Sequence, residues 1–219
     1  GCGVAEDEER AAELYKLAAD QGHAMAQFSL GHMHNGGRGV AQDDKRAAEL
    51  YKLAADQGDA DAQNSLGWSY HKGLGVPRNY GIAMSWYIKA AAQNNSYAQD
   101  NIGALYENGH GVPINYQEAA KWYERATENN NDWGNYHLGE LYFRGLGVKQ
   151  NYQKALKHFS AAARSQNIKA YEKLSHMYEF GIGVERNLET ATKWLKKINH
   201  AQVDQGTSGL FGLNQTKAT

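Results

Sequence analysis

Histidine and carboxylate side chains come closest in this sequence to the spacing of a metal or catalytic site. Glu172, His176 and Glu179 lie three or four residues apart, so a helix would place them on one face. Glu140 stands 36 residues before His176 and is expected to be its neighbour in a 36-residue repeat. One histidine among carboxylates is a weak ligand set, and a solvated surface explains these residues better. The sequence therefore predicts no metal and no cofactor.

Nucleophilic and phosphate chemistry have no recognisable arrangement either. The chain has one cysteine, Cys2, which leaves no second thiol for a disulfide within the chain. No Ser-His-Asp order is present, and the glycine-rich segments do not follow a predicted strand, as a dinucleotide site requires. We therefore do not expect an enzyme.

Charge and hydropathy exclude two further classes of partner. The 219 residues include 23 Lys and Arg against 24 Asp and Glu, a formal net charge of −1. Such a balance gives no basic surface for nucleic acid or for anionic lipid. No apolar run approaches the length that spans a bilayer, so membrane insertion is not expected.

A repeat of 36 residues organises the chain. The segment RAAELYKLAADQG occurs at 10–22 and again at 46–58. Two motifs recur at the same interval and indicate a repeat architecture. They are a Leu-Gly type pair at Leu30-Gly31, Leu66-Gly67, Ile102-Gly103, Leu138-Gly139 and Leu174-Ser175, and a Gly-x-Gly-Val loop beginning at Gly37, Gly73, Gly109, Gly145 and Gly181.

Each period is predicted to contain two helices, helix A before the glycine loop and helix B after it. In helix A, Ala26, Leu30 and Met33 share one apolar face. Helix B is expected to begin after an Asp or Asn, because these residues cap helix N-termini. The predicted caps are Asp7, Asp43, Asn79, Asn115, Asn151 and Asn187. The tryptophans of helix B, Trp86, Trp122 and Trp194, recur in register and are interpreted as packing residues rather than as a ligand site.

These motifs together resemble the Sel1-like repeat (SLR) family, a relative of the tetratricopeptide repeat. The shared pattern is A-x-x-x-L-G-x-x-Y, then G-x-G-V, then D/N-x-x-x-A-x-x-W-Y-x-x-A-A. Departures include His34 for the tyrosine, Ser175 for the glycine and His158 for the tryptophan. The resemblance implies an all-α fold, a right-handed α/α superhelix (solenoid). It also implies an adaptor that binds protein, and on family distribution we favour a bacterial periplasmic or secreted location.

The predicted solenoid covers residues 1–200. Gly1-Cys2-Gly3-Val4 falls in register with the glycine loop at 37–40, so we expect helix B at 7–21 and part of a repeat upstream of it. The full repeats are expected at about 23–58, 59–94, 95–130, 131–166 and 167–200. Residues 201–219 break the pattern and are expected to form a C-terminal cap or a flexible tail.

Alignment of the Leu-Gly pairs with those of tetratricopeptide repeats implies which face of helix A lines the concave groove. The residues at these positions vary between repeats, and Trp, Tyr and Arg are the types that most often anchor interfaces. We expect a groove for a protein or peptide; the alternative is self-association through the solenoid ends. The predicted groove residues are Phe28, Trp68, His71, Tyr97, Asp100, Glu107, Trp133, Tyr136, Glu140, Phe143 and Arg144.

Overall fold

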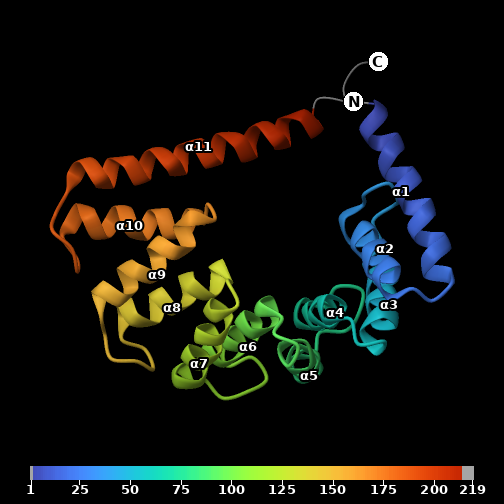
Figure 1. The fold of residues 1–219 in the computed structure, drawn as a ribbon, viewed down its shortest axis with the longest axis horizontal. Coiled ribbons are helices and arrows are strands. Elements are labelled where there is room, and N and C mark those ends of the chain that lie inside the picture. The colour runs from blue at the N-terminus through green and yellow to red at the C-terminus, as the bar shows by residue number, and fades with distance from the viewer. Residues whose placement is uncertain (1, 214–219) are drawn as a thin grey trace. The chain divides into compact units, whose positions relative to one another are not determined.

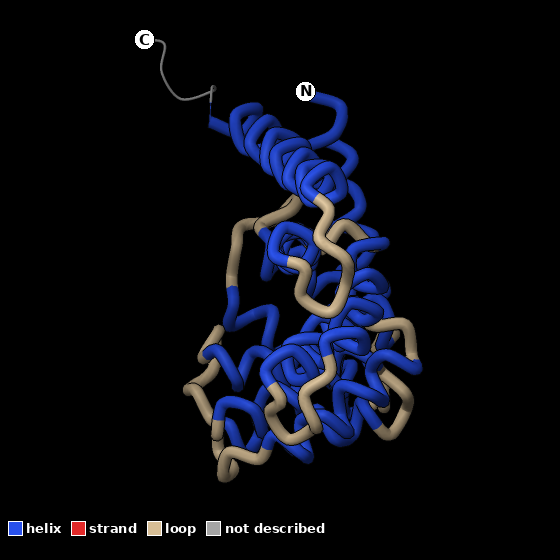
Figure 2. Tube along the Cα trace, turned by 90° about the vertical axis from the view of Figure 1, so that its left-hand side faces the viewer, coloured by secondary structure: helices blue, strands red, loops and turns tan. Residues whose placement is uncertain are grey.

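The computed structural model describes the backbone of residues 2–213 and the side chains of residues 7–199 and 201. Within this range the chain consists of helices and connecting loops, without any strand (Figure 2). The contacts divide the chain into two compact units, Gly1–Asn115 and Tyr116–Thr219. The prediction of an all-α fold is therefore confirmed.

The first unit contains three helices of the B type, α1, α3 and α5, and three of the A type, α2, α4 and α6 (Figure 1). Successive helices pack against each other, α2 on α3 and α4 on α5 most extensively. Their bounds are α1 (Cys2–Asp20), α2 (Ala24–Gly36), α3 (Asp44–Asp56), α4 (Ala60–Lys72), α5 (Tyr80–Ala91) and α6 (Ser96–Asn108).

The second unit continues the alternation. Here α8 packs on α9, and α10 packs on α11. The bounds are α7 (Tyr116–Glu128), α8 (Asp132–Arg144), α9 (Tyr152–Arg164), α10 (Ile168–Phe180) and α11 (Leu188–Leu213). Of the predicted terminal segment 201–219, residues 214–219 lie outside the described residues, as do the side chains from 202 onward.

The glycine of the Leu-Gly pair is needed because an aromatic ring of helix B rests on the backbone of helix A and leaves no room for a side chain there. A Cβ on Gly31 would lie 2.9 Å from the Tyr51 ring, and one on Gly139 would lie 2.7 Å from the Phe159 ring. In the last repeat the glycine is Ser175 and the aromatic is Leu195. Ser175 Oγ donates a hydrogen bond to the Ala191 carbonyl, 3.1 Å away, so the hydroxyl is satisfied where the ring is missing.

The glycine loops hold neighbouring repeats together. The first glycine ends helix A in the left-handed region, as Gly109 does at φ 69°. The second packs against the start of the preceding helix B. A Cβ on Gly111, at φ +74°, would lie 2.7 Å from Tyr80 Cβ. A side chain at either position is therefore disfavoured, which explains the Gly-x-Gly spacing.

Four of the predicted N-caps of helix B are confirmed, and the cap at Asn115 stays a prediction. The side-chain oxygens of Asp43, Asn79, Asn151 and Asn187 each accept a hydrogen bond from the backbone N–H three residues on, over 2.8 to 3.0 Å. The prediction for Asp7 is wrong, because α1 begins at Cys2 and Asp7 lies inside the helix. Residues 2–4, which were expected to form a loop, are part of α1.

Candidate protein-binding surface

The predicted groove residues of the first unit lie in different environments. Trp68 and Tyr97 are exposed on α4 and α6. Lys72 Nζ lies 4.4 Å from the centre of the Trp68 ring, one helical turn on. Phe28 is half-buried and packs on Tyr51, with ring centroids 5.9 Å apart. Trp68 and Tyr97 are thus the large side chains of this group that a partner can reach.

His71 is buried rather than presented to a partner. It is 8% exposed and lies within an aromatic cluster. Its ring lies 5.5 Å from those of Tyr80 and His110, and Tyr80 stacks on His110 at 4.6 Å. Burial, with added repulsion from Lys72, His110 and Arg78, lowers the pKa of His71 to about 4. This histidine is therefore neutral near pH 7 and joins two repeats instead of lining a groove.

The acidic residues predicted for the first unit, Asp100 and Glu107, are half-buried on α6. An amide pair contributes to the contact between α4 and α6, and one of its members, Asn101, was not singled out from the sequence. Asn101 Nδ2 donates to Asn64 Oδ1 over 3.0 Å. The spacing in the sequence could have identified Asn101, because it lies one helical turn after Tyr97 and therefore on the same helix face.

The second unit brings its predicted residues together along the seam between α8 and α10. Trp133 is 43% exposed, and its ring centroid lies 6.1 Å from that of the half-buried Tyr136. Lys169 Nζ, from α10, lies 5.7 Å from the Trp133 ring centre and 6.0 Å from that of Tyr136. These distances place an exposed cation over two aromatic rings from the neighbouring repeat.

Further along the same seam, Glu140 meets a lysine. Lys173 Nζ lies 2.9 Å from Glu140 Oε1, off the hydrogen-bonding direction, so the contact is ionic. Lys173 Nζ also lies 5.6 Å from the Phe143 ring centre. The structure thus pairs Glu140 with a residue that the sequence analysis did not select. His176, the expected neighbour of Glu140, instead contacts Phe143, with centroids 6.5 Å apart.

The end of the seam is apolar and basic. Phe180 is exposed, and its ring centroid lies 4.8 Å from that of His176. Arg144 is exposed at the end of α8. We call this surface the α8–α10 seam; it consists of Trp133, Tyr136, Glu140, Phe143, Arg144, Lys169, Lys173, His176 and Phe180.

Metal binding and membrane crossing find no support in the described part of the chain. No three His, Cys, Asp or Glu side chains there are grouped closely enough to hold a metal ion. No helix in that range combines the length and the apolar character needed to cross a bilayer.

The tryptophans of helix B lie half-buried outside the seam. Each carries a cation from three residues on, as when Arg125 lies 4.7 Å from the Trp122 ring centre. A lysine does the same for Trp86 and Trp194, at 4.0 and 4.5 Å. Trp86 also packs against the buried cluster that contains Tyr51, and Trp194 stacks on Tyr171 with ring centroids 5.5 Å apart, as expected of packing residues.

Stacked helix pairs and a varied helix A face define the class of α-solenoid proteins, in which neighbouring repeats bury one another's apolar faces. The chain belongs to the Sel1 repeat family, whose model matches residues 1–23, 24–59, 60–95, 96–131, 134–167 and 168–198. Proteins of this family are generally protein-interaction scaffolds and are typically not enzymes.

Solved structures of the same fold come from several bacteria. A protective antigen of uropathogenic Escherichia coli strains, which displays an SLR fold, is 33% identical with a TM-score of 0.75. The match covers 96% of this chain but 45% of that one, so the chain spans about half the length of that relative. A Sel1 repeat protein from Oxalobacter formigenes is 33% identical over 82% of this chain and 73% of its own, with a TM-score of 0.77.

A more distant structure supports the fold alone. An immunity protein from Pseudomonas aeruginosa is 20% identical, covers 86% of this chain and 72% of its own, and has a TM-score of 0.61. No curated protein is similar enough to the chain to count as a relative.

Proposed function

We propose that this protein is an adaptor that binds a peptide or protein partner on the helix A face of its repeats. The α8–α10 seam is the main contact surface of the second unit, and Trp68 and Tyr97 contribute in the first. The observation that carries the proposal is the exposure of Trp133 beside Lys169, at one end of a surface on which Phe180 is also exposed.

The composition of the seam is suited to protein recognition. Aromatic rings supply large contact area at a small cost in conformational entropy, and they are enriched at the centres of interfaces. The rings of Tyr136 and Phe143 rest against Phe159, with centroids 5.9 and 6.4 Å away. Because the core holds these rings in place, a partner does not have to order them on binding.

The partner class can be tested by selecting peptides from a phage-displayed random library on the folded chain. The selected peptides are then titrated against wild type and against Trp133→Ala plus Tyr136→Ala. We expect the double variant to weaken binding by about 100-fold, because two interface anchors of roughly 1–2 kcal/mol each are removed.

The matched control is Trp122→Ala, which removes a half-buried tryptophan of the same unit from helix B. It should leave peptide affinity unchanged. Undiminished affinity of a folded Trp133→Ala plus Tyr136→Ala variant would rule out the seam as the binding surface. Circular dichroism and thermal unfolding establish that each variant is folded.

A further inference from the structure

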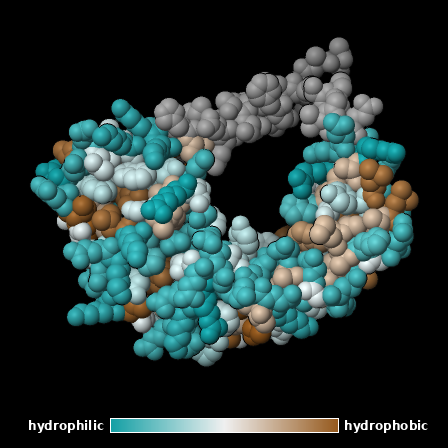
Figure 3. All heavy atoms as spheres, viewed as in Figure 1, coloured by the Kyte–Doolittle hydropathy of each residue, from teal (hydrophilic) through white to brown (hydrophobic). Residues whose placement is uncertain are grey.

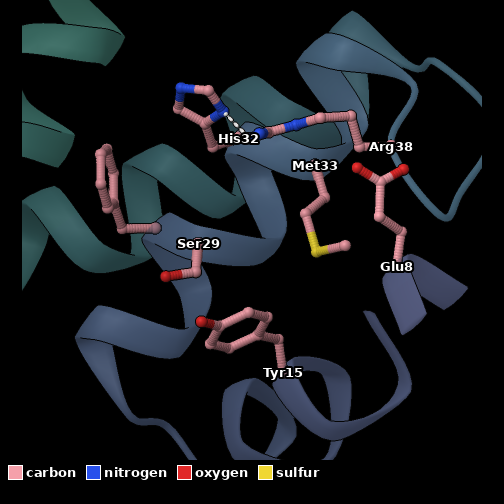
Figure 4. A pocket seen from close by; sticks show the side chains of 7 residues that line it. Glu8, Tyr15, Ser29, His32, Met33 and Arg38 are labelled. Atoms are coloured by element: carbon pink, nitrogen blue, oxygen red, sulfur yellow. Dashed lines mark hydrogen bonds between the residues drawn. The ribbon is translucent and has the colours of Figure 1, made fainter. Parts of the chain in front are cut away.

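Two cavities adjoin different faces of α1 in the first unit. One is lined by Tyr15 of α1 and by Ser29 and Met33 of α2, as Figure 4 shows. Tyr15 belongs to an exposed face of α1, and apolar side chains gather on the surface near this helix (Figure 3). The equivalent of Tyr15 in α3 is Tyr51, whose ring rests on Gly31 of α2. This first cavity therefore belongs to a helix-packing face.

The second cavity is enclosed by α1, α2 and α3 and has a volume of about 520 Å³. Its floor is apolar, because Ala12 and Leu30 are only 4% and 3% exposed. We call it the α1–α3 cavity. Its main lining residues are Ala12 and Lys16 of α1, Leu30 and His34 of α2, Val40 of the glycine loop and Arg46 of α3.

This cavity coincides with a departure from the repeat pattern at His34. The equivalent position is a tyrosine in each later repeat: Tyr70, Tyr106, Tyr142 and Tyr178. The imidazole ring is shorter than a phenol ring. His34 Nδ1 also lies 3.3 Å from the Ala41 carbonyl oxygen, so the ring is held against the glycine loop. The space arises from a substitution within the first repeat, whatever precedes α1.

The fourth repeat shows what occupies the equivalent space. Tyr142 is 8% exposed, and Lys154 Nζ lies 4.8 Å from its ring centre. The Tyr142 hydroxyl lies 3.5 Å from Glu124 Oε1. Lys154 and Glu124 correspond to Arg46 and Lys16, 108 residues earlier, and both of these line the α1–α3 cavity. A phenol ring thus fills this space in the fourth repeat.

The second repeat agrees with the fourth. Tyr70 packs against a buried cluster that includes Leu66. Leu66 is the equivalent of Leu30, which forms part of the cavity floor. The tyrosine therefore covers this leucine where it is present, and the cavity takes its place beside His34.

The charged side chains around the cavity favour a neutral occupant. Three of them are already paired with a neighbour on their own helix, over 2.7 to 3.1 Å. The pairs are Glu13 with Arg10, Lys16 with Asp20, and Arg46 with Glu49. The fourth charged group, Glu9, is exposed, so water hydrates its carboxylate. A cation such as Arg46 still attracts the face of an uncharged aromatic ring.

From these contacts we propose that the α1–α3 cavity binds a small, neutral molecule that carries a phenol ring. The ring takes the place of the tyrosine that His34 replaces. It rests on Ala12 and Leu30 and lies under Arg46, as Tyr142 lies under Lys154. The volume is within the range of small-molecule sites, about 300–1,000 Å³. The site is separate from the α8–α10 seam and does not depend on the function proposed above.

The test uses p-cresol, which is the tyrosine side chain as a free molecule. It is titrated into the isotope-labelled chain and followed by nuclear magnetic resonance. We expect saturable shifts of the backbone amides around Ala12, Leu30 and Arg46, with a dissociation constant in the millimolar range. Methylcyclohexanol has a similar shape but no aromatic face for Arg46, and should bind at least about three-fold more weakly.

Two protein variants complete the experiment. His34→Tyr restores the residue of the other repeats and should abolish binding, because its own ring fills the cavity. Arg46→Met keeps a long side chain but removes the cation, and should weaken binding about three-fold. Circular dichroism establishes that each variant is folded.

Each of four results would overturn the proposal. The first is the absence of saturable shifts up to about 10 mM p-cresol, a concentration that detects very weak binding. The second is undiminished binding by folded His34→Tyr, and the third is equal affinity for methylcyclohexanol. The fourth is a set of shifts centred on Ser29 and Met33, which would place the ligand in the cavity of Figure 4 instead.

Discussion

Gly67 and Tyr87 are in such close contact that a single methyl group between them does not fit. A Cβ on Gly67 would lie 2.7 Å from the Tyr87 ring, and Tyr87 itself is fully buried. The ring cannot move away, because the core around it is closed. The contact fixes the distance between α4 and α5.

We predict that Gly67→Ala destabilises the chain by about 1–3 kcal/mol, the usual cost of overpacking, despite the better helix propensity of alanine. Urea unfolding measures the change. Gly36→Ala is the control, because a Cβ there meets only the Arg38 side chain at 3.5 Å. That control should be neutral or stabilising, and a neutral Gly67→Ala would contradict the packing described here.

Stability should fall in acid because His71 is buried as the neutral ring. Its pKa of about 4 in the folded chain lies below the ordinary value of 6.5. Well above pH 6.5, His71 is neutral in both the folded and the unfolded chain, so it does not make the free energy of unfolding depend on pH. As the pH falls from 6.5 towards 4, the unfolded chain binds a proton that the folded chain does not, so the free energy of unfolding decreases.

The expected decrease due to His71 is about 2 kcal/mol between pH 7.5 and pH 5. Urea unfolding at the two pH values measures it. Other groups also titrate in this range, so the comparison is with His71→Phe, which keeps a ring in the cluster. The variant should lose less stability on acidification than wild type; equal losses would show that His71 is not the cause.

The corrected position of Asp7 leads to a paired test of capping. Asn151→Ala should destabilise the second unit by about 1 kcal/mol, because the Asn151 side chain caps α9. Asp7→Ala should change stability by no more than a few tenths of a kcal/mol, since Asp7 lies within α1. If thermal unfolding shows the two substitutions to be equally costly, α1 begins at Asp7 as the sequence suggested.

The ion pair between Glu140 and Lys173 should couple neighbouring repeats. The two side chains are 16% and 33% exposed. A double-mutant cycle with Glu140→Gln and Lys173→Met should give a coupling on the order of 1 kcal/mol, decreasing as salt is added. A coupling of zero at low salt would mean that the pair forms no net stabilising contact.

The sequence by itself determined the period, the helix pairing and the glycine loops. These features depend on local rules: a glycine for a left-handed turn, Asp or Asn for a cap, and an apolar residue every three or four positions. The Leu-Gly pair and the Gly-x-Gly loop could therefore be recognised from one repeat to the next, with Ser175 as the departure from the pair. The exception, Asp7, failed because continuation of α1 through residues 2–6 removed the helix start that a cap requires.

Only the tertiary structure decided which side chains are exposed. His71 was predicted to lie in the groove but is buried, because His110, from the next repeat, covers it. The identical residues Leu14 and Leu50 are exposed and buried respectively. Burial depends on neighbours 16 or more residues away, which no local pattern encodes, and the same limit explains why Lys173 was not foreseen as the partner of Glu140.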